Sequence, residues 1–301
     1  MRGEAVARTG TSTSTIRDVV MVFKPRIALF IMLSALGGMA VSPGPAPAAW
    51  QIMALALAVF LAAGSAGAFN QWAERDLDAR MKRTSRRPFA TGRFVAGRAW
   101  LGAIFATLVV AVALAGIAAN WWAALYTFLG AFTYGVVYTL WLKRRTWTNI
   151  IVGGLAGSFA VLAGAAAVNP GLGTEAVVLT VVLFLWTPPH FWSLAMAARE
   201  DYARAGVPML PVVAGNQVCA LAILAHTVSL SLLALVPAFY GMGWIYLGAA
   251  VAGGGLFCWT SAMLAIWPDR VNALKNFFAS LAQLCLLLGG AMAERAIGVV
   301  A

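Results

Sequence analysis

Three oxygen-bearing side chains, Asn70, Glu74 and Asp78, recur at a spacing of four residues in the segment NQWAERDLDAR. In a helix, residues four apart lie on one face, so these three side chains would stack within an arc of about 80°. Proteins hold Mg²⁺ with one or two carboxylates together with phosphate oxygens and water. The spacing therefore predicts a metal site formed by Asn70, Glu74 and Asp78 and completed by a diphosphate.

Cations cluster directly after this segment and again about sixty residues later. The clusters are Lys82, Arg83, Arg86 and Arg87, and then Lys143, Arg144 and Arg145, which the neutral donors Thr146 and Asn149 follow. Ammonium and guanidinium groups bind phosphate oxygens, so both clusters are candidate contacts for one diphosphate. Two other interpretations stay open. The cations could instead contact anionic lipid headgroups, and the acids of a solvated helix end could pair with Arg75, Arg80 and Lys82.

A second polar segment, WTPPHFWSLAMAARED, combines a proline pair, a histidine and two acids. Pro188 and Pro189 lie inside an apolar stretch and are expected to break its helix, because proline lacks the N–H that a helix requires. His190 follows directly and is a candidate ligand beside a cavity, with a hydrogen-bonded packing residue as the alternative. If the helix continues, His190 and Asp201 share a face. For the second histidine, His226, packing is the favoured interpretation.

Membrane-spanning helices must position these residues. Of the 301 residues, 62% are hydrophobic and 10% are charged, and the mean hydropathy is +0.84. This composition leaves too little polar surface for a water-soluble domain. About 20 apolar residues cross the hydrocarbon layer as a helix, and nine uncharged stretches of about that length predict an all-α integral membrane protein with nine helices. The stretches are 27–43, 50–69, 99–118, 121–142, 149–168, 176–198, 217–239, 244–267 and 277–293.

The net charge of +11 does not indicate binding to nucleic acid, because a nucleic-acid-binding protein presents its basic face on a water-soluble fold. With the N-terminus in the cytoplasm, 20 of the 21 Lys and Arg residues fall on the cytoplasmic side, and Arg295 falls on the other. The positive-inside rule therefore predicts a cytoplasmic N-terminus and a C-terminus on the opposite side. We expect residues 1–20 to form a disordered cytoplasmic tail and residues 21–301 to form one polytopic membrane domain.

Taken together, these motifs resemble the UbiA superfamily of intramembrane prenyltransferases over about residues 20–290. Members of that superfamily carry an NxxxDxxxD motif at the end of the second helix and another acidic motif at the end of the sixth. Asn70, Glu74 and Asp78 match the first motif, with Glu in its middle position. Within the superfamily, the chain resembles the branch that farnesylates heme B. The residues that carry this resemblance are Lys24-Pro25-Arg26, Met81, Arg83, Thr84, Arg87, Pro88, the KRRTxxN stretch from Lys143 to Asn149, Pro189-His190-Phe191, Glu200-Asp201-Tyr202, and Pro208 to Pro211.

The resemblance implies both a reaction and residue roles. In that branch, farnesyl diphosphate is joined to a vinyl group of heme B and diphosphate is released, in the bacterial inner membrane with the active site toward the cytoplasm. It implies that Asn70, Glu74 and Asp78 hold Mg²⁺ on the diphosphate, and that His190 borders the acceptor heme. The residues implied in diphosphate binding are Arg26, Lys82, Arg83, Arg87, Lys143, Arg144, Thr146, Asn149 and Asp201. The implied partners are farnesyl diphosphate, heme B, the lipid bilayer and, as a candidate recipient of the product, heme A synthase.

Two other functions stay open. One is a UbiA-type enzyme that prenylates a quinone precursor, which is disfavoured because those relatives carry Asp at the positions of His190 and Ala197. The other is a nine-helix secondary transporter, which is disfavoured because the acids concentrate at one membrane surface and not at the midplane. The chain also departs from the family after Gly153-Gly154, where it reads GSFAVLAG and family members often carry a Pro-Pro pair.

Overall fold

The computed structural model describes residues 12–298, and every regular element in that part of the chain is a helix. The long elements are α2 (Pro25–Val41), α3 (Ala49–Ala73), α5 (Arg98–Ala118), α6 (Trp121–Phe132) continued by the π-helix η1 (Thr133–Leu142), α8 (Leu155–Val168) preceded by α7 (Asn149–Gly153), α9 (Thr174–Ala197), α12 (Gly215–Leu233) followed by the 3-10 helix η2 (Val236–Tyr240), α13 (Trp244–Ile266) and α14 (Arg270–Ala296). The short elements are α1 (Ser12–Val22), α4 (Arg75–Arg80), α10 (Arg199–Arg204) and α11 (Leu210–Val213).

The nine predicted stretches correspond to the long elements. Within the described residues, eight helices are long and apolar enough to cross a membrane. A ninth is obtained when α1 and α2, which meet at a bend of 45°, are taken together as one span. The prediction of an all-α membrane bundle is confirmed. The uncharged stretches could be recognised in the sequence because a helix must be about 20 apolar residues long to cross the hydrocarbon layer.

The N-terminal segment differs from the expected disordered tail over residues 1–20. Residues 1–11 lie outside the described part of the chain, whereas Ser12–Val22 form α1. Val22 is buried in a cluster with Phe89, and the amide Nε2 of Gln71 donates to the carbonyls of Met21 and Val22, each at 3.0 Å. These contacts attach the end of α1 to α3, which the polar composition of the segment does not indicate. The boundary between a tail and a membrane domain stays a prediction.

The proline pair does not break its helix. α9 continues without interruption through Pro188 and Pro189. The hydroxyl of Thr187 donates to the carbonyl of Leu183 at 3.0 Å, and that of Ser193 donates to the carbonyl of Pro189 at 2.6 Å. Membrane helices tolerate proline where hydroxyl side chains and neighbouring helices compensate for the lost hydrogen bonds. The predicted break is therefore wrong: α9 also packs against α8, α12 and α14.

Small residues let α2 and α8 approach each other closely. A side-chain carbon added at Gly38 of α2 would collide with the carbonyl of Val161, and one added at Gly164 of α8 would collide with the carbonyl of Ala35. Contacts of this kind supply the van der Waals packing that holds membrane helices together. Residues 157–164, where family members often carry a Pro-Pro pair, are continuous helix here.

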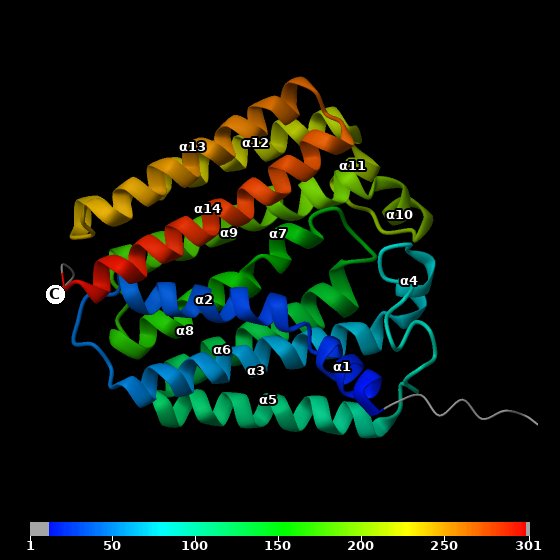
Figure 1. Ribbon diagram of the computed structural model, residues 1–301, viewed down its shortest axis with the longest axis horizontal. Coiled ribbons are helices and arrows are strands. Elements are labelled where there is room, and N and C mark those ends of the chain that lie inside the picture. The colour runs from blue at the N-terminus through cyan, green and yellow to red at the C-terminus, as the bar shows by residue number, and fades with distance from the viewer. Residues whose placement is uncertain (1–11, 299–301) are drawn as a thin grey trace, which may run out of the picture.

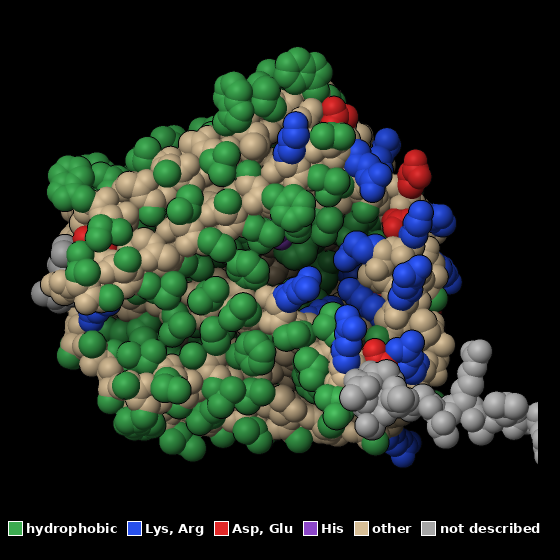
Figure 2. All heavy atoms as spheres, viewed as in Figure 1, with side chains coloured by type: hydrophobic (Ala, Val, Ile, Leu, Met, Phe, Trp, Pro, Cys, Tyr) green, Lys and Arg blue, Asp and Glu red, His purple; other side chains and the backbone are tan. Residues whose placement is uncertain are grey.

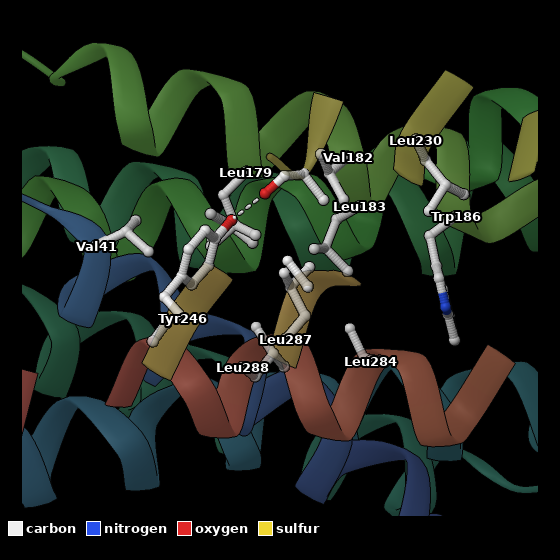
Figure 3. Packing of buried hydrophobic residues seen from close by; sticks show 14 of the residues in the cluster. Val41, Leu179, Val182, Leu183, Trp186, Leu230, Tyr246, Leu284, Leu287 and Leu288 are labelled. Carbon is white, nitrogen blue, oxygen red and sulfur yellow. Dashed lines mark hydrogen bonds between the residues drawn. The ribbon is translucent and has the colours of Figure 1, made fainter. Parts of the chain in front are cut away.

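An apolar core holds α9, α12, α13 and α14 against one another. Figure 3 shows Leu179 and Leu183 of α9 opposite Leu287 of α14, with Tyr246 of α13 beside them. The hydroxyl of Tyr246 is buried and donates to the carbonyl of Ala234 at 2.8 Å, so the one polar atom of this ring is satisfied. This packing fixes α9 beside α14.

The two ends of the bundle differ in charge. Figure 1 shows α4, α10 and α11 together at one end and the C-terminus at the other. Lys and Arg side chains gather over the end that carries α4 and α10 (Figure 2). We call this the basic end; it comprises α4, α10, α11 and the connections 81–97 and 143–148. The surface is hollowed between α2 and α14 close to this end (Figure 2).

Candidate functional site

The acidic motif lies at the basic end, where α3 meets α4. Glu74 separates the two helices and has a non-helical backbone, with φ −101° and ψ 12°. Helical hydrogen bonds nevertheless continue across this bend, from the Glu74 N–H to the Asn70 carbonyl at 3.0 Å and from the Asp78 N–H to the Glu74 carbonyl at 2.8 Å. All three motif side chains are buried, with exposures of 2% or less. The three side chains of the motif therefore lie on consecutive helical turns, and all are buried, although the backbone bends at Glu74.

Both carboxylates of the motif are paired with cations that the family resemblance implies in diphosphate binding. Lys143 Nζ forms an ion pair with Glu74 Oε2. Arg87 Nη1 lies 2.9 and 2.8 Å from the two carboxylate oxygens of Asp78. The other oxygen of Glu74, Oε1, is buried without a hydrogen-bond partner among the described residues. An unpartnered buried carboxylate oxygen is costly unless a donor or a cation reaches it, so Oε1 is a candidate metal contact.

A third cation at this site, Lys24, was missed by sequence reasoning as a site residue. Its Nζ donates to Asn70 Oδ1 at 2.5 Å and to the Tyr134 hydroxyl at 3.1 Å, while Asn70 Nδ2 donates to Thr139 Oγ1 at 3.0 Å. Lys24 reaches the site from the bend between α1 and α2 in a left-handed conformation with φ 50°. Gly67 leaves room, since a side-chain carbon there would lie 3.3 Å from the lysine stem. The sequence signal that could have identified Lys24 is its position directly before Pro25, the proline at which α2 begins.

A cavity of about 230 Å³ opens beside this cluster and is lined by Ala73, Glu74, Thr139, Leu140 and Arg144. Within the part of the chain that the structure describes, no group of three or more His, Cys, Asp and Glu residues could hold a metal ion alone. Mg²⁺ seldom needs such a cage, because it binds carboxylates together with substrate phosphates and water. Glu74, with one oxygen that lacks a hydrogen-bond partner within the described chain, and Arg144 at the same cavity therefore fit a metal–diphosphate complex.

The other predicted diphosphate contacts lie around the basic end. Arg26, Lys82 and Arg83 are exposed. The backbone N–H of Arg83 donates to a carboxylate oxygen of Asp201 at 3.4 Å, which connects the segment after α4 to α10. Asp201 also forms an ion pair with Arg204 at 2.5 Å. The hydrogen bond from Arg83 thus connects the segment after the first acidic motif to the side chain of an acid in the second.

Thr146 and Asn149 form part of the turn that follows Lys143. Asn149 Nδ2 donates to the carbonyl of Thr146 at 2.6 Å, and the hydroxyls of Thr146 and Thr148 lie 2.9 Å apart. Asn149 is fully buried, and its Oδ1 has no hydrogen-bond partner among the described residues. Thr146 therefore shapes the turn, whereas Asn149 keeps a buried oxygen without a hydrogen-bond partner in the described part of the chain.

His190 lies on α9, where it faces α14, and is 7% exposed. Its ring stacks between Trp186 and Phe277, with centroid separations of 4.3 and 4.5 Å. Its Nδ1 lies 2.7 Å from the Ser280 hydroxyl oxygen. Because α9 ends before α10 begins, Asp201 does not share a continuous helix with His190, and the condition for a common face is not met.

Sequence comparisons place the chain among prenyltransferases. Residues 31–284 match the UbiA prenyltransferase family. Protoheme IX farnesyltransferase 2 from Paramagnetospirillum magneticum is 55% identical over 282 residues, which cover 94% of this chain and 98% of that protein. Protoheme IX farnesyltransferase 1 from the same organism is 47% identical over 285 residues, which cover 93% of this chain and 99% of that protein.

Solved structures share the fold at low sequence identity. A UbiA homolog from Archaeoglobus fulgidus, bound to DMAPP and Mg²⁺, matches with a TM-score of 0.72 and 16% identity, covering 93% of this chain and 99% of that chain. A structure of digeranylgeranylglyceryl phosphate synthase matches with a TM-score of 0.75 and 15% identity, covering 94% and 99%. With a sequence match over most of its length and this shared fold, the chain belongs to the UbiA prenyltransferase family.

Proposed function

We propose that this chain is a protoheme IX farnesyltransferase, which transfers the farnesyl group of farnesyl diphosphate to a vinyl group of heme B and releases diphosphate. Relatives of that name are 55% and 47% identical over nearly the whole chain. The structural observation that carries the proposal is the buried Glu74 carboxylate. One of its oxygens has no hydrogen-bond partner among the described residues, Lys143 pairs with the other, and Arg144 lines the adjoining cavity.

On the donor side, Asn70, Glu74 and Asp78 would hold Mg²⁺, whose positive charge stabilises a leaving diphosphate. Lys143 and Arg87 neutralise the two carboxylates in the structure. With their carboxylate partners neutralised by the metal, Lys143 and Arg87 would be free to bind the diphosphate oxygens. Their charge then favours cleavage of the C–O bond to an allylic cation. The further proposed diphosphate contacts are Arg26, Lys82, Arg83, Arg144, Thr146, Asn149 and Asp201.

On the acceptor side, His190 would border heme B among aromatic side chains of α9 and α14. The vinyl π electrons form the new carbon–carbon bond with the farnesyl cation, and water then adds to the second vinyl carbon and loses a proton. The product carries a hydroxyethylfarnesyl group. Both the farnesyl chain and the porphyrin are apolar, so a site inside a helical membrane bundle suits them.

The charge distribution supports an orientation in which the basic end faces the cytoplasm of the bacterial inner membrane. Lys and Arg gather at that end (Figure 2), and cytoplasmic connections carry an excess of these residues. The N-terminus would then be cytoplasmic and the C-terminus on the opposite side. Heme A synthase stays the candidate recipient of the product.

The reaction can be tested in membranes that contain the full-length protein. The membranes are incubated with heme B, Mg²⁺ and isotopically labelled farnesyl diphosphate, and the product is identified by mass. We expect a farnesylated, hydrated heme, and loss of product when a chelator removes Mg²⁺. Membranes without the protein are the control. Transfer of the label to an aromatic acid and not to heme would refute the proposal and support the quinone-precursor alternative.

A further inference from the structure

The surroundings of His190 determine which of its ring nitrogens carries the proton. The Ser280 hydroxyl oxygen lies 2.6 Å from the Phe277 carbonyl and donates its single proton to it. The same oxygen lies 2.7 Å from His190 Nδ1. Because a hydroxyl has one proton and two lone pairs, Ser280 can only accept from Nδ1. We therefore assign the proton of the neutral imidazole to Nδ1 and the lone pair to Nε2.

The ring is held in this orientation on both faces and through Ser280. Trp186 and Phe277 stack on its two faces, and Trp186 Nε1 donates to the Ser280 carbonyl at 3.0 Å. Among the described residues, Nε2 has no hydrogen-bond partner. It is not completely buried and retains some accessible surface. α14, which carries Ser280, borders the hollow in Figure 2.

The lone pair on Nε2 restricts what part of a heme this nitrogen can contact. A propionate of heme offers only acceptor oxygens, which need a donor and would be repelled by a nitrogen lone pair. The iron of heme accepts a lone pair, and a neutral imidazole is its common protein ligand. A hydrogen bond from the opposite N–H fixes the ring and raises the basicity of the ligating nitrogen.

We infer that His190 ligates the iron of the acceptor heme through Nε2, and that Ser280 is a positioning residue that holds His190 in the Nδ1–H tautomer. This inference rests on the proposed function, because it requires an iron porphyrin as acceptor. It excludes a role in which Nε2 binds a propionate. Ligation at the ring centre fixes the height and tilt of the porphyrin, and therefore where its vinyl groups lie.

Two porphyrins with the same ring and the same propionates separate iron ligation from other contacts. Ferric heme B and iron-free protoporphyrin IX are titrated into the detergent-solubilised full-length protein and into His190→Ala. We expect the variant to raise the heme dissociation constant about tenfold or more and to lose the absorption bands of a nitrogen-ligated iron. Affinity for the iron-free porphyrin should change by less than about twofold and also shows that the variant is folded.

The matched control is the other histidine of the chain. His226, on α12, has its Nδ1 2.8 Å from the carbonyl of Ala222 in its own helix and its ring edge-on to Trp192. His226→Ala should keep the wild-type heme affinity and spectrum.

The role of Ser280 is tested by a change that leaves the imidazole in place. Ser280→Ala should weaken heme binding about tenfold and shift the iron–histidine stretching band of the ferrous complex, with binding of the iron-free porphyrin unchanged. Ser280→Thr keeps the hydroxyl and should restore both properties. A purely structural role for Ser280 would lower the affinity for both porphyrins and leave the vibrational band in place.

The iron-ligation inference is overturned if His190→Ala weakens both porphyrins equally or neither, while wild-type protein still farnesylates heme. The positioning role is overturned if Ser280→Ala leaves heme affinity and the iron–histidine band unchanged. Wild-type protein that binds no heme and makes no farnesylated heme would instead overturn the proposed function, and the inference with it.

Discussion

The two halves of the proposed reaction site satisfy their polar groups in opposite ways. The donor site comprises Lys24, Asn70, Glu74, Asp78, Arg87 and Lys143, and pairs each motif side chain with a cation. The acceptor site comprises Trp186, His190, Phe277 and Ser280, and surrounds one imidazole with aromatic rings and a neutral hydroxyl. The three motif side chains and His190 are all buried, so the two sites differ mainly in the chemistry of the groups that surround them.

This difference indicates what each site can do when a substrate binds. Ion pairs between flexible side chains can exchange partners, so cations of the donor site can turn from carboxylates to a diphosphate once a metal neutralises the carboxylates. A ring that is stacked on both faces and hydrogen-bonded on one edge has a fixed orientation. We therefore expect the donor site to rearrange during the reaction and the acceptor site to be pre-formed.

The largest expected effect is the loss of metal binding at the donor site. Asp78→Asn removes a buried carboxylate and should lower kcat at least about 10²–10³-fold, because the charge that holds a metal on the diphosphate is lost. The matched control is Asp76→Asn two residues away, whose side chain is 73% exposed. Farnesylated heme is measured by mass at saturating substrates. Wild-type turnover in Asp78→Asn would contradict the metal assignment.

The second effect concerns stability and separates ion pairing from catalysis. Lys143→Gln leaves Glu74 as a buried carboxylate without its partner, which should cost about 3–5 kcal/mol of unfolding free energy. The double variant Glu74→Gln/Lys143→Gln removes both charges and should recover most of that stability, while activity stays low. Reversible unfolding in mixed detergent measures both. Additive losses in the double variant would show that the two side chains are not coupled.

The contrast between the two sites also explains what could be predicted from the sequence. The bundle follows from nine uncharged stretches, because crossing a bilayer demands apolar length and little else. The spacing of Asn70, Glu74 and Asp78 is a local pattern, and the structure buries all three. The pairing of Lys24 with Asn70 spans 46 residues and that of His190 with Ser280 spans 90, so neither follows from spacing along one helix.

The expected break at Pro188 failed for a related reason. A local rule treats proline as the end of a helix, but the hydroxyls of Thr187 and Ser193 and three neighbouring helices stabilise α9. Those neighbours are known only once the bundle is assembled. Local sequence patterns thus indicated a motif whose three side chains the structure buries, whereas the surroundings of His190 depend on packing between distant helices.

A third prediction tests whether the donor site exchanges partners. If Lys24 turns from Asn70 to the diphosphate, Lys24→Met removes a charge-assisted hydrogen bond worth about 1.5–3 kcal/mol, so KM for farnesyl diphosphate should rise roughly 10- to 150-fold. KM for heme B should change less than about twofold. Arg26→Gln, an exposed cation two positions away, should have a smaller effect on KM for farnesyl diphosphate. A larger effect from Arg26→Gln would assign the diphosphate contact to the exposed residue.

The smallest expected effect tests whether the acceptor site is pre-formed. Trp186→Phe keeps a ring against His190 but removes the Nε1 hydrogen bond to the Ser280 carbonyl, and should lower the unfolding free energy by about 1 kcal/mol. Since that bond helps to hold α9 to α14, KM for heme B should rise a few-fold, by roughly 2–5. KM for farnesyl diphosphate should not change, because no donor-site contact involves Trp186. A change in both constants would show that the two sites are coupled, and that the acceptor site also rearranges when the donor binds.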